Sequence, residues 1–297
     1  MEDNLDLRIG SIAEKLVSIE ETVREIRSLV GPFGVSFGND TILVQTIHGI
    51  KYIIDSTDLV MAPQLVVYRQ WEAELTKFIS NSLTPDTVFV DVGASFGYYT
   101  CLAATKIGQS GTGKVFSFEP NKKIHNLLKK NLFINWSMAP VMVFESALSD
   151  STGYADFFVP HGYSANARFS GTEHQGEGEQ KFSVRTMTLD EAIGETNVDL
   201  MKIDVEGFET AVLRGAPKVI ARSESLIIII EWSLGQMQTA GYSANDLFDL
   251  FDKYGLAAYK LPETRFLDED TWRTLSISRN ELQGFAYDNI VLRRPIN

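Results

Sequence analysis

The stretch 87–100, TVFVDVGASFGYYT, determines the fold that we expect for this chain. It opens with an apolar, β-branched run, Val88 to Val92, which is too short for a stable helix and is typical of a central parallel strand. Asp91 falls at the carboxyl end of that strand, where open α/β sheets bind ligands. Gly93 and Gly97 bracket the following turn and allow a ligand to approach the backbone closely. The stretch therefore predicts a nucleotide-binding turn in an α/β sheet.

The spacing of the glycines separates classes of cofactor. A dinucleotide site needs GxGxxG, which places a pyrophosphate on a helix N-terminus, whereas this chain has DxGxxxG. The next strand, KVFSFEP, ends in Glu119, whose carboxylate can accept both hydroxyls of a ribose. This alternation of acid, glycine turn, helix, strand and acid is typical of sites for S-adenosylmethionine, a cation that suits an acidic mouth. A glycine turn followed by a solvated glutamate in any other α/β protein is the alternative interpretation.

Composition narrows the class of protein. The chain has 297 residues, of which 44% are hydrophobic, enough for one large α/β domain with an appendage. Its net charge of −12 argues against nucleic acid as the main partner, because phosphate binding needs clustered Lys and Arg. The start of the chain is acidic, unlike a signal peptide, and no apolar run approaches the ~20 residues of a membrane span. We therefore expect a cytoplasmic protein without a membrane span.

Residues 4–30 carry an apolar stripe with heptad spacing. Its members recur at alternating steps of four and three: Leu5, Ile9, Ile12, Leu16, Ile19, Val23, Ile26 and Val30. The stripe predicts a coiled coil over residues 1–31 that assembles the chain into a homo-oligomer. Isoleucine at most of the d positions favours a trimer over a dimer. The alternative is an amphipathic helix that lies on its own domain.

Removal of the stripe tests this prediction. Light scattering should show more chains per particle for the full sequence than for a chain that begins at Gly34, because the shorter chain lacks the interhelical contacts. If both run as the same species, the stripe packs on its own domain and the predicted oligomer is wrong.

Residues 32–62 are expected to form a β-hairpin extension. The apolar runs TILVQTI and KYIID lie on either side of a turn at His48 and Gly49. The remaining residues, 63–297, should form the domain that carries the chemistry, and they begin with a predicted helix over 63–80.

Two later strands also end in ionisable residues. In VDLMKIDVEGFE, side chains alternate, so Lys202 and Asp204 share a face while Asp204 and Glu206 lie at the carboxyl end. A lysine in a central strand is costly unless it is paired, and a simple Lys202–Asp204 salt bridge is the alternative to a catalytic role. The strand SLIIIIEWS similarly ends in Glu231. Between these regions and the glycine turn, the polar loop 161–181 is either a substrate lid or an ordinary surface loop.

Six motifs in chain order resemble those of the FkbM-type methyltransferases: DVGASFGYYT, FEP, SALSD, TLDEA, KIDVEGFE and YDNIVL. The resemblance covers roughly residues 71–293 and leaves the N-terminal heptads outside. It implies a class I methyltransferase fold, a Rossmann-like α/β sheet of about seven mostly parallel strands with an antiparallel last strand. It also implies S-adenosylmethionine as methyl donor and an oxygen acceptor on a sugar, polyketide or related product. One departure is visible, because the family usually has Asn where this chain has Ser95.

The resemblance also implies roles for individual residues. The residues expected to bind the donor are Asp91, Gly93, Ser95 and Gly97 at the methionine end, Glu119 at the ribose, and Ser146 and Ala147 at the adenine. Asp204 and Glu206 are expected to face the acceptor, with Asp204 as base or orienting group and Lys202 tuning it. Alternatively, Asp204, Glu206 and Glu231 could hold a divalent cation such as Mg²⁺ that acidifies the hydroxyl.

We therefore expect an S-adenosylmethionine-dependent O-methyltransferase that acts on a small-molecule or glycan acceptor. Two other classes remain open. A dinucleotide-dependent oxidoreductase is disfavoured by the missing GxGxxG. A non-catalytic assembly protein, with a Rossmann-like scaffold behind a coiled coil, would use the heptads as its function.

Overall fold

The computed structural model describes residues 15–16, 19–20, 22–23, 34–136, 139–159, 168–169 and 180–295. Its central sheet contains the parallel strands β4 (Val88–Val92), β5 (Lys114–Phe118), β6 (Val141–Phe144), β11 (Leu200–Ile203) and β12 (Ile227–Ser233). It is completed by β13 (Ala257–Lys260), β14 (Ser276–Ile277) and β15 (Tyr287–Arg293). The order is β14-β13-β15-β12-β11-β4-β5-β6, and β15 runs antiparallel to both of its neighbours. The expected mostly parallel sheet with an antiparallel last strand is confirmed, and the two-residue β14 extends it by one strand.

The direction of chain winding reverses between β4 and β11. From β4 the chain moves outward through β5 and β6, then returns to the other side of β4 to form β11 and β12. Open α/β sheets bind ligands in the crevice at the carboxyl ends of the strands at such a reversal. The fold therefore places the expected site where β4 and β11 end.

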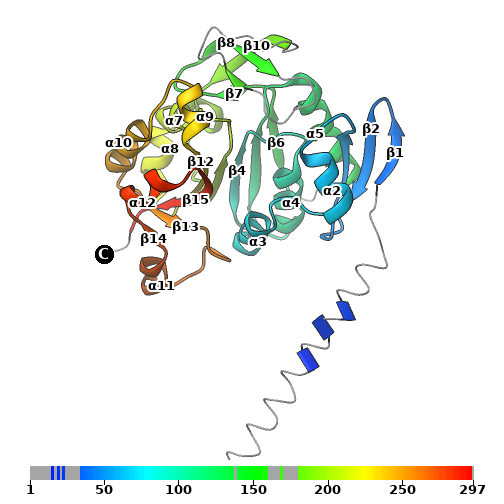
Figure 1. The fold of residues 1–297 in the computed structure, drawn as a ribbon, viewed down its shortest axis with the longest axis horizontal. Coiled ribbons are helices and arrows are strands. Elements are labelled where there is room, and N and C mark those ends of the chain that lie inside the picture. The colour runs from blue at the N-terminus through cyan, green and yellow to red at the C-terminus, as the bar shows by residue number, and fades with distance from the viewer. Residues whose placement is uncertain are drawn as a thin grey trace, which may run out of the picture.

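Helices cover both faces of the sheet (Figure 1). One layer contains α6 (Leu189–Ile193), α7 (Glu209–Arg214), α8 (Pro217–Arg222) and α10 (Ala244–Tyr254). The other contains α2 (Met61–Tyr68), α3 (Ala73–Ser82), α4 (Tyr98–Ile107) and α5 (Lys122–Ile134). The helices α9 (Leu234–Thr239), α11 (Glu269–Thr274) and α12 (Arg279–Gly284) lie in the connections around β12 to β15.

Alternation along the strands decides which side chains face which layer. Val90, Ile203 and Ile230 belong to the core beneath α7, α8 and α10, whereas their neighbours Phe89 and Ile229 belong to the core beneath α2 to α5. Successive side chains of a strand point to opposite faces. The charged residues at positions 91, 202 and 231 therefore share the face covered by α2 to α5.

The predicted helix over 63–80 is wrong, because two helices separated by a bend occupy this region. α2 ends at Tyr68 and is followed by Arg69, which has φ 58°, and Glu72, with φ 37°, precedes α3. The sequence offers no Gly or Pro at this bend, so tertiary contacts fix it. The Arg69 carbonyl accepts from the Ile47 amide at 2.9 Å, and the Trp71 amide donates to the Tyr98 hydroxyl at 3.1 Å. The bend carries Trp71 and Glu72 into the site described below.

The N-terminal extension is a three-stranded antiparallel sheet of β1 (Gly34–Gly38), β2 (Thr41–Gln45) and β3 (Lys51–Asp55). The expected hairpin corresponds to β2 and β3, and β1 adds a strand that the sequence pattern did not predict. The extension shares the core of the main domain, since Val44, Tyr52 and Ile54 belong to the same buried cluster as residues of α3, α4 and α5. The Asn131 side chain of α5 also accepts from the Ile53 amide at 2.7 Å and donates to its carbonyl at 3.0 Å.

A smaller sheet lies beside the carboxyl end of the main one (Figure 1). It consists of β7 (Ala147–Leu148), β8 (Gly153–Val159), β9 (Arg168–Phe169) and β10 (Gln180–Met187), in the order β7-β10-β8-β9. The two strands expected to flank the polar loop are therefore present, as β8 and β10. Most of the loop 161–181 lies outside the described residues, so its role as a lid stays a prediction.

The predicted coiled coil also lies outside the described residues, apart from six positions. Those six are helical, and Leu16, Ile19 and Val23 among them are exposed. Within the described part of the chain, no helix combines the length and apolar character needed to cross a membrane.

Candidate active site

A cavity of about 260 Å³ opens at the carboxyl ends of β4, β5, β11 and β12. Its wall combines residues of these strands with residues of the α2–α4 region, of β7 and β8, and of α9 and β15. The charged residues that line it are Glu72, Glu119, Lys202, Asp204, Glu206 and Glu231. Five carboxylates thus surround one amine, and the expected acidic mouth is present.

Glu119, at the end of β5, is oriented by backbone donors. One carboxylate oxygen accepts from the Ser95 amide at 2.9 Å and the other from the Asn121 amide at 2.7 Å. Burial raises the pKa of Glu119 to about 7, although both hydrogen bonds oppose that shift. The carboxylate is therefore held in one orientation at the cavity wall, as a ribose acceptor requires.

The structure shows why the turn tolerates serine at position 95. This residue has φ 50°, in the left-handed region that asparagine enters more readily than most side chains. The asparagine expected at this position from the family resemblance would thus suit the backbone of the turn. In this chain the backbone amide of Ser95 still reaches Glu119, so the contact with the acid does not depend on the side chain.

The two glycines of the turn are required for packing. A Cβ on Gly93, which has φ 76°, would lie 1.9 Å from the Asp204 carbonyl oxygen. A Cβ on Gly97, which has φ 92°, would lie 2.9 Å from Leu128 of α5. Gly93 lines the cavity whereas Gly97 begins α4 outside its wall. A valine at Gly93 would displace the turn from β11, so such a variant tests folding and donor binding together.

The predicted donor residues divide between the cavity wall and the layer behind it. Ala147 lines the cavity, but its neighbour Ser146 is buried with its hydroxyl 3.1 Å from Met187 Sδ. Asp91 is fully buried beneath the wall and accepts from Thr100 Oγ1 at 2.6 Å. The structure therefore brings Gly93, Ser95, Glu119 and Ala147 together around the cavity and leaves Asp91, Gly97 and Ser146 as supporting residues outside the lining.

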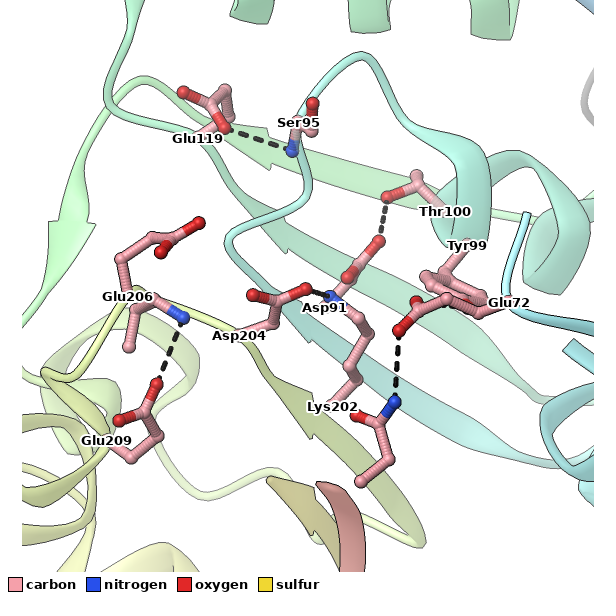
Figure 2. Close-up of polar contacts among 12 residues, drawn as sticks. Glu72, Asp91, Ser95, Tyr99, Thr100, Glu119, Lys202, Asp204, Glu206 and Glu209 are labelled. Carbon is pink, nitrogen blue, oxygen red and sulfur yellow. Dashed lines mark hydrogen bonds and ion pairs between the residues drawn. The ribbon is translucent and has the colours of Figure 1, made fainter. Parts of the chain in front are cut away.

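Lys202 is the centre of the charged cluster (Figure 2). Its Nζ donates to Asp204 Oδ2 at 2.9 Å and lies 5.2 Å from the centre of the Tyr99 ring, and Asp91 is its partner in the register of β4 and β11. Burial alone would lower the pKa of Lys202, but Asp204, Asp91 and Glu72 outweigh it and raise the pKa. The ion pair considered from the sequence is therefore present, and it lies in the cavity wall.

Sequence reasoning missed Glu72. Its two carboxylate oxygens accept from the Tyr99 hydroxyl at 2.8 Å and from Asn289 Nδ2 at 2.9 Å, and Figure 2 shows Glu72 beside Tyr99 and turned toward Lys202. The predicted continuous helix gave no reason to place this side chain at the site. Asn289 did leave a signal, because it interrupts the apolar strand YDNIVL.

The side of the cavity nearest β12 and α9 is formed by Glu206, Glu231, Gln236 and Tyr287. Gln236 Nε2 donates to Glu206 Oε2, and Glu206 has φ 55°. Burial, then Asp204 and Glu209, raise the pKa of Glu206 to about 8. Burial, then Asp204 and Glu206, raise the pKa of Glu231 to about 9, against a hydrogen bond with Tyr287.

The divalent-cation alternative gains no support from this arrangement. Across the described ranges, no group of three or more His, Cys, Asp and Glu side chains is placed so that it could hold a metal ion. Glu209, which follows Glu206 in KIDVEGFE, has a structural role, since one of its oxygens accepts from the Val205 and Gly207 amides at 3.2 and 3.3 Å. It holds the loop that presents Asp204 and Glu206.

A profile described as "Methyltransferase FkbM domain" matches residues 91–256, more than half of the chain. The chain belongs to the FkbM methyltransferase family. The matched range contains the glycine turn, Glu119 and the KIDVEGFE loop, and it includes most of the residues that line the cavity. Glu72, Tyr287 and Asn289 lie outside the matched range, so this FkbM chain completes its site with residues from both flanks.

Two curated relatives illustrate the range of the match. Hexuronic acid methyltransferase AglP of Haloferax volcanii is 28% identical over 162 residues, which cover 54% of this chain and 62% of AglP. Methyltransferase sdnD of Sordaria araneosa is 27% identical over 163 residues, covering 45% of this chain and 62% of sdnD. The FkbM chain thus spans a little under two thirds of each relative. Among solved structures, P. horikoshii TYW2 in complex with MeSAdo has a TM-score of 0.45 at 14% identity, with 86% of this chain and 70% of that chain covered.

Proposed function

We propose that this FkbM-family chain transfers a methyl group from S-adenosylmethionine to a hydroxyl oxygen of a sugar, a glycan or a secondary metabolite. The observation that carries the proposal is the acidic cavity at the reversal between β4 and β11, in which Glu119 and the Lys202–Asp204 pair line the same space. The family match supports methyl transfer and argues against the oxidoreductase alternative. The name of the relative AglP, a hexuronic acid methyltransferase, supports a sugar acceptor.

The described residues fit the donor. Glu119 would accept from the ribose hydroxyls, and the apolar side chains of Phe118, Ala147 and Leu148 line the adjacent wall, where an adenine would bury its faces. The backbone of Gly93 and Ser95 would lie along the methionine end. When bound there, S-adenosylmethionine supplies an electrophilic methyl group.

Asp204 is the group best placed to take the proton of the acceptor hydroxyl. Lys202 holds its Oδ2, and the other oxygen points away from Lys202 in Figure 2. Asp204 is about one third exposed, unlike the buried Asp91, so an acceptor can reach it. Methyl transfer is an in-line displacement, so a fixed base contributes both by orienting the hydroxyl and by removing its proton.

Donor binding provides the direct test, with Glu119→Gln as the variant. An amide oxygen can replace only one of the two acceptor oxygens that Ser95 and Asn121 now occupy, and its NH₂ group would face a backbone donor. We expect calorimetry with S-adenosylhomocysteine to show affinity reduced by about tenfold or more.

The matched control for this prediction is Glu224→Gln, which changes an exposed glutamate in the same way and should leave affinity unchanged. Wild-type affinity in Glu119→Gln would remove Glu119 from the ribose site. If the wild-type protein bound neither S-adenosylmethionine nor its demethylated product, the proposed function itself would be wrong.

A further inference from the structure

Two buried oxygen atoms in the part of the cavity near β12 and α9 lack a hydrogen-bond donor. Within the described part of the chain, Glu231 Oε2 and Gln236 Oε1 have no hydrogen-bond partner, and both residues line the cavity. Glu231 is only 9% exposed. A buried acceptor without a donor costs free energy, about 1–3 kcal/mol and more for a charged group. The site is therefore arranged to receive hydrogen-bond donors from a ligand.

The acidic residues around Glu231 and Gln236 favour a ligand group that donates hydrogen bonds and carries a positive charge. Glu206 lies beside Glu231 closely enough to raise the pKa of that carboxyl, after burial and Asp204, and Gln236 donates to Glu206. Among the described residues of the cavity wall, the only amine is that of Lys202, which is bonded to Asp204 and acts on Glu206 too weakly to offset the burial and the neighbouring carboxylates that raise the pKa of Glu206. Since the described carboxylates do not converge on a metal position, an organic cation fits better than a metal ion. An ammonium group donates three hydrogen bonds and neutralises charge at once.

We propose that the methyl acceptor carries a protonated amine near its hydroxyl and that Glu231, Glu206 and Gln236 bind this ammonium. The proposal rests on the proposed function, because it names the class of acceptor for the same cavity. The hydroxyl would lie at Asp204, and the ammonium at the Oε2 of Glu231 and the Oε1 of Gln236, two acceptors without donors whose residues both line the cavity.

The donor also carries an ammonium at its methionine end, but the topology separates it from this position. The turn that contains Gly93 follows β4, whereas Glu231 lies near the end of β12, and β11 intervenes between the two strands. Gln236 lies in α9, on the same side as β12. This separation favours assigning the ammonium bound by Glu231 to the acceptor.

This subsite has a consequence for anionic sugars. The pKa values of Glu206 and Glu231, about 8 and 9, leave this pair largely protonated at neutral pH, and a bound ammonium would favour its ionised form. A uronate carboxylate in the same position would add another acid without a counter-charge and would bind less favourably. Although AglP is named for a hexuronic acid, this chain should therefore discriminate against uronates and prefer amino sugars or other amine-bearing alcohols.

The test compares three probes of one ring size: glucosamine, glucose and glucuronic acid. Each is titrated by calorimetry at fixed ionic strength and neutral pH into the full chain, with and without saturating S-adenosylhomocysteine. We expect glucosamine to bind at least about tenfold more tightly than glucose, and glucuronic acid to bind more weakly than glucose. In Glu231→Gln, the preference for glucosamine over glucose should disappear, while affinity for S-adenosylhomocysteine is kept. Glu195→Gln, at an exposed glutamate, should behave as wild type.

The other outcomes overturn the proposal. Equal binding of glucose and glucosamine, tighter binding of glucuronic acid, or no binding of glucosamine up to about 10 mM would each do so. A preference that persists in Glu231→Gln would remove this residue from the subsite. If Glu231→Gln weakened S-adenosylhomocysteine and left glucosamine unchanged, the ammonium would be that of the donor. If the wild-type protein did not bind S-adenosylhomocysteine, only the proposed function would be contradicted. The sugar titrations without S-adenosylhomocysteine would still test the subsite.

Discussion

Asp204→Asn should lower methyl transfer by about 10²- to 10⁴-fold, the usual contribution of a positioned general base. Asparagine keeps the size of the side chain and can still accept from Lys202 Nζ, which bonds Asp204 at 2.9 Å, but it cannot take up the proton of a hydroxyl. Affinity for S-adenosylhomocysteine should stay close to wild type, because Glu119 and the glycine turn are unchanged. A labelled-methyl assay against lysate glycans and small metabolites measures turnover, and calorimetry measures donor binding.

Asp199→Asn is the matched control, at the opposite end of the same strand. Asp199 accepts from the Val88 amide at 2.8 Å, a bond that an asparagine oxygen can keep, and it lies outside the cavity wall. Turnover by this variant should remain near wild type. If Asp204→Asn lost donor binding as strongly as turnover, Asp204 would belong to the donor site; if it retained full turnover, it would not be the base.

Lys202→Met should lower the free energy of unfolding by about 3–5 kcal/mol, the typical cost of removing one partner from a buried group of charges. The side chain of Lys202 is 5% exposed, and the three carboxylates of Glu72, Asp91 and Asp204 stabilise its charge. Methionine has a similar volume but leaves these carboxylates without their cation. Denaturant unfolding, with the slope compared between variants, gives the loss directly.

Lys77→Met provides the control, since the Lys77–Glu263 ion pair has the same chemistry on the surface, with both side chains more than half exposed. Its effect should stay within about 1 kcal/mol. A second variant that adds Asp91→Asn to Lys202→Met should recover part of the loss, because it removes one of the uncompensated charges. No recovery would show that lost packing against Tyr99, and not charge, accounts for the effect.

The strands that end at the cavity show which parts of the site local sequence patterns could predict. The apolar runs around Asp91, Glu119, Lys202 and Glu231 predicted buried strands, and their alternation correctly placed Lys202 and Asp204 on one face. These inferences depend only on the two-residue period of a strand and on the direction of parallel strands, both of which are local properties of the chain.

The residues that were missed entered the site through long-range contacts. Glu72 turns into the cavity because its segment bends at Arg69 and Trp71, where backbone bonds to Ile47 and to the Tyr98 hydroxyl replace the helix. Asn289 reaches Glu72 across 217 residues of sequence. No local pattern encodes such a contact, so the apolar spacing of this segment predicts one helix that continues through the bend.

Taken by itself, the sequence determined the class of sheet, the turn that follows its first parallel strand, and the acids that end its strands, because strand period, glycine conformation and chain order are properties of neighbouring residues. Tertiary structure alone decided which of those acids reach the cavity. Asp91 and Glu119 both end apolar strands, yet Asp91 points into the layer beneath α4 and is bonded to Thr100, whereas Glu119 lies in the cavity wall. Burial and partners are set by packing between distant elements, and they decide whether a carboxylate supports a site or binds its ligand.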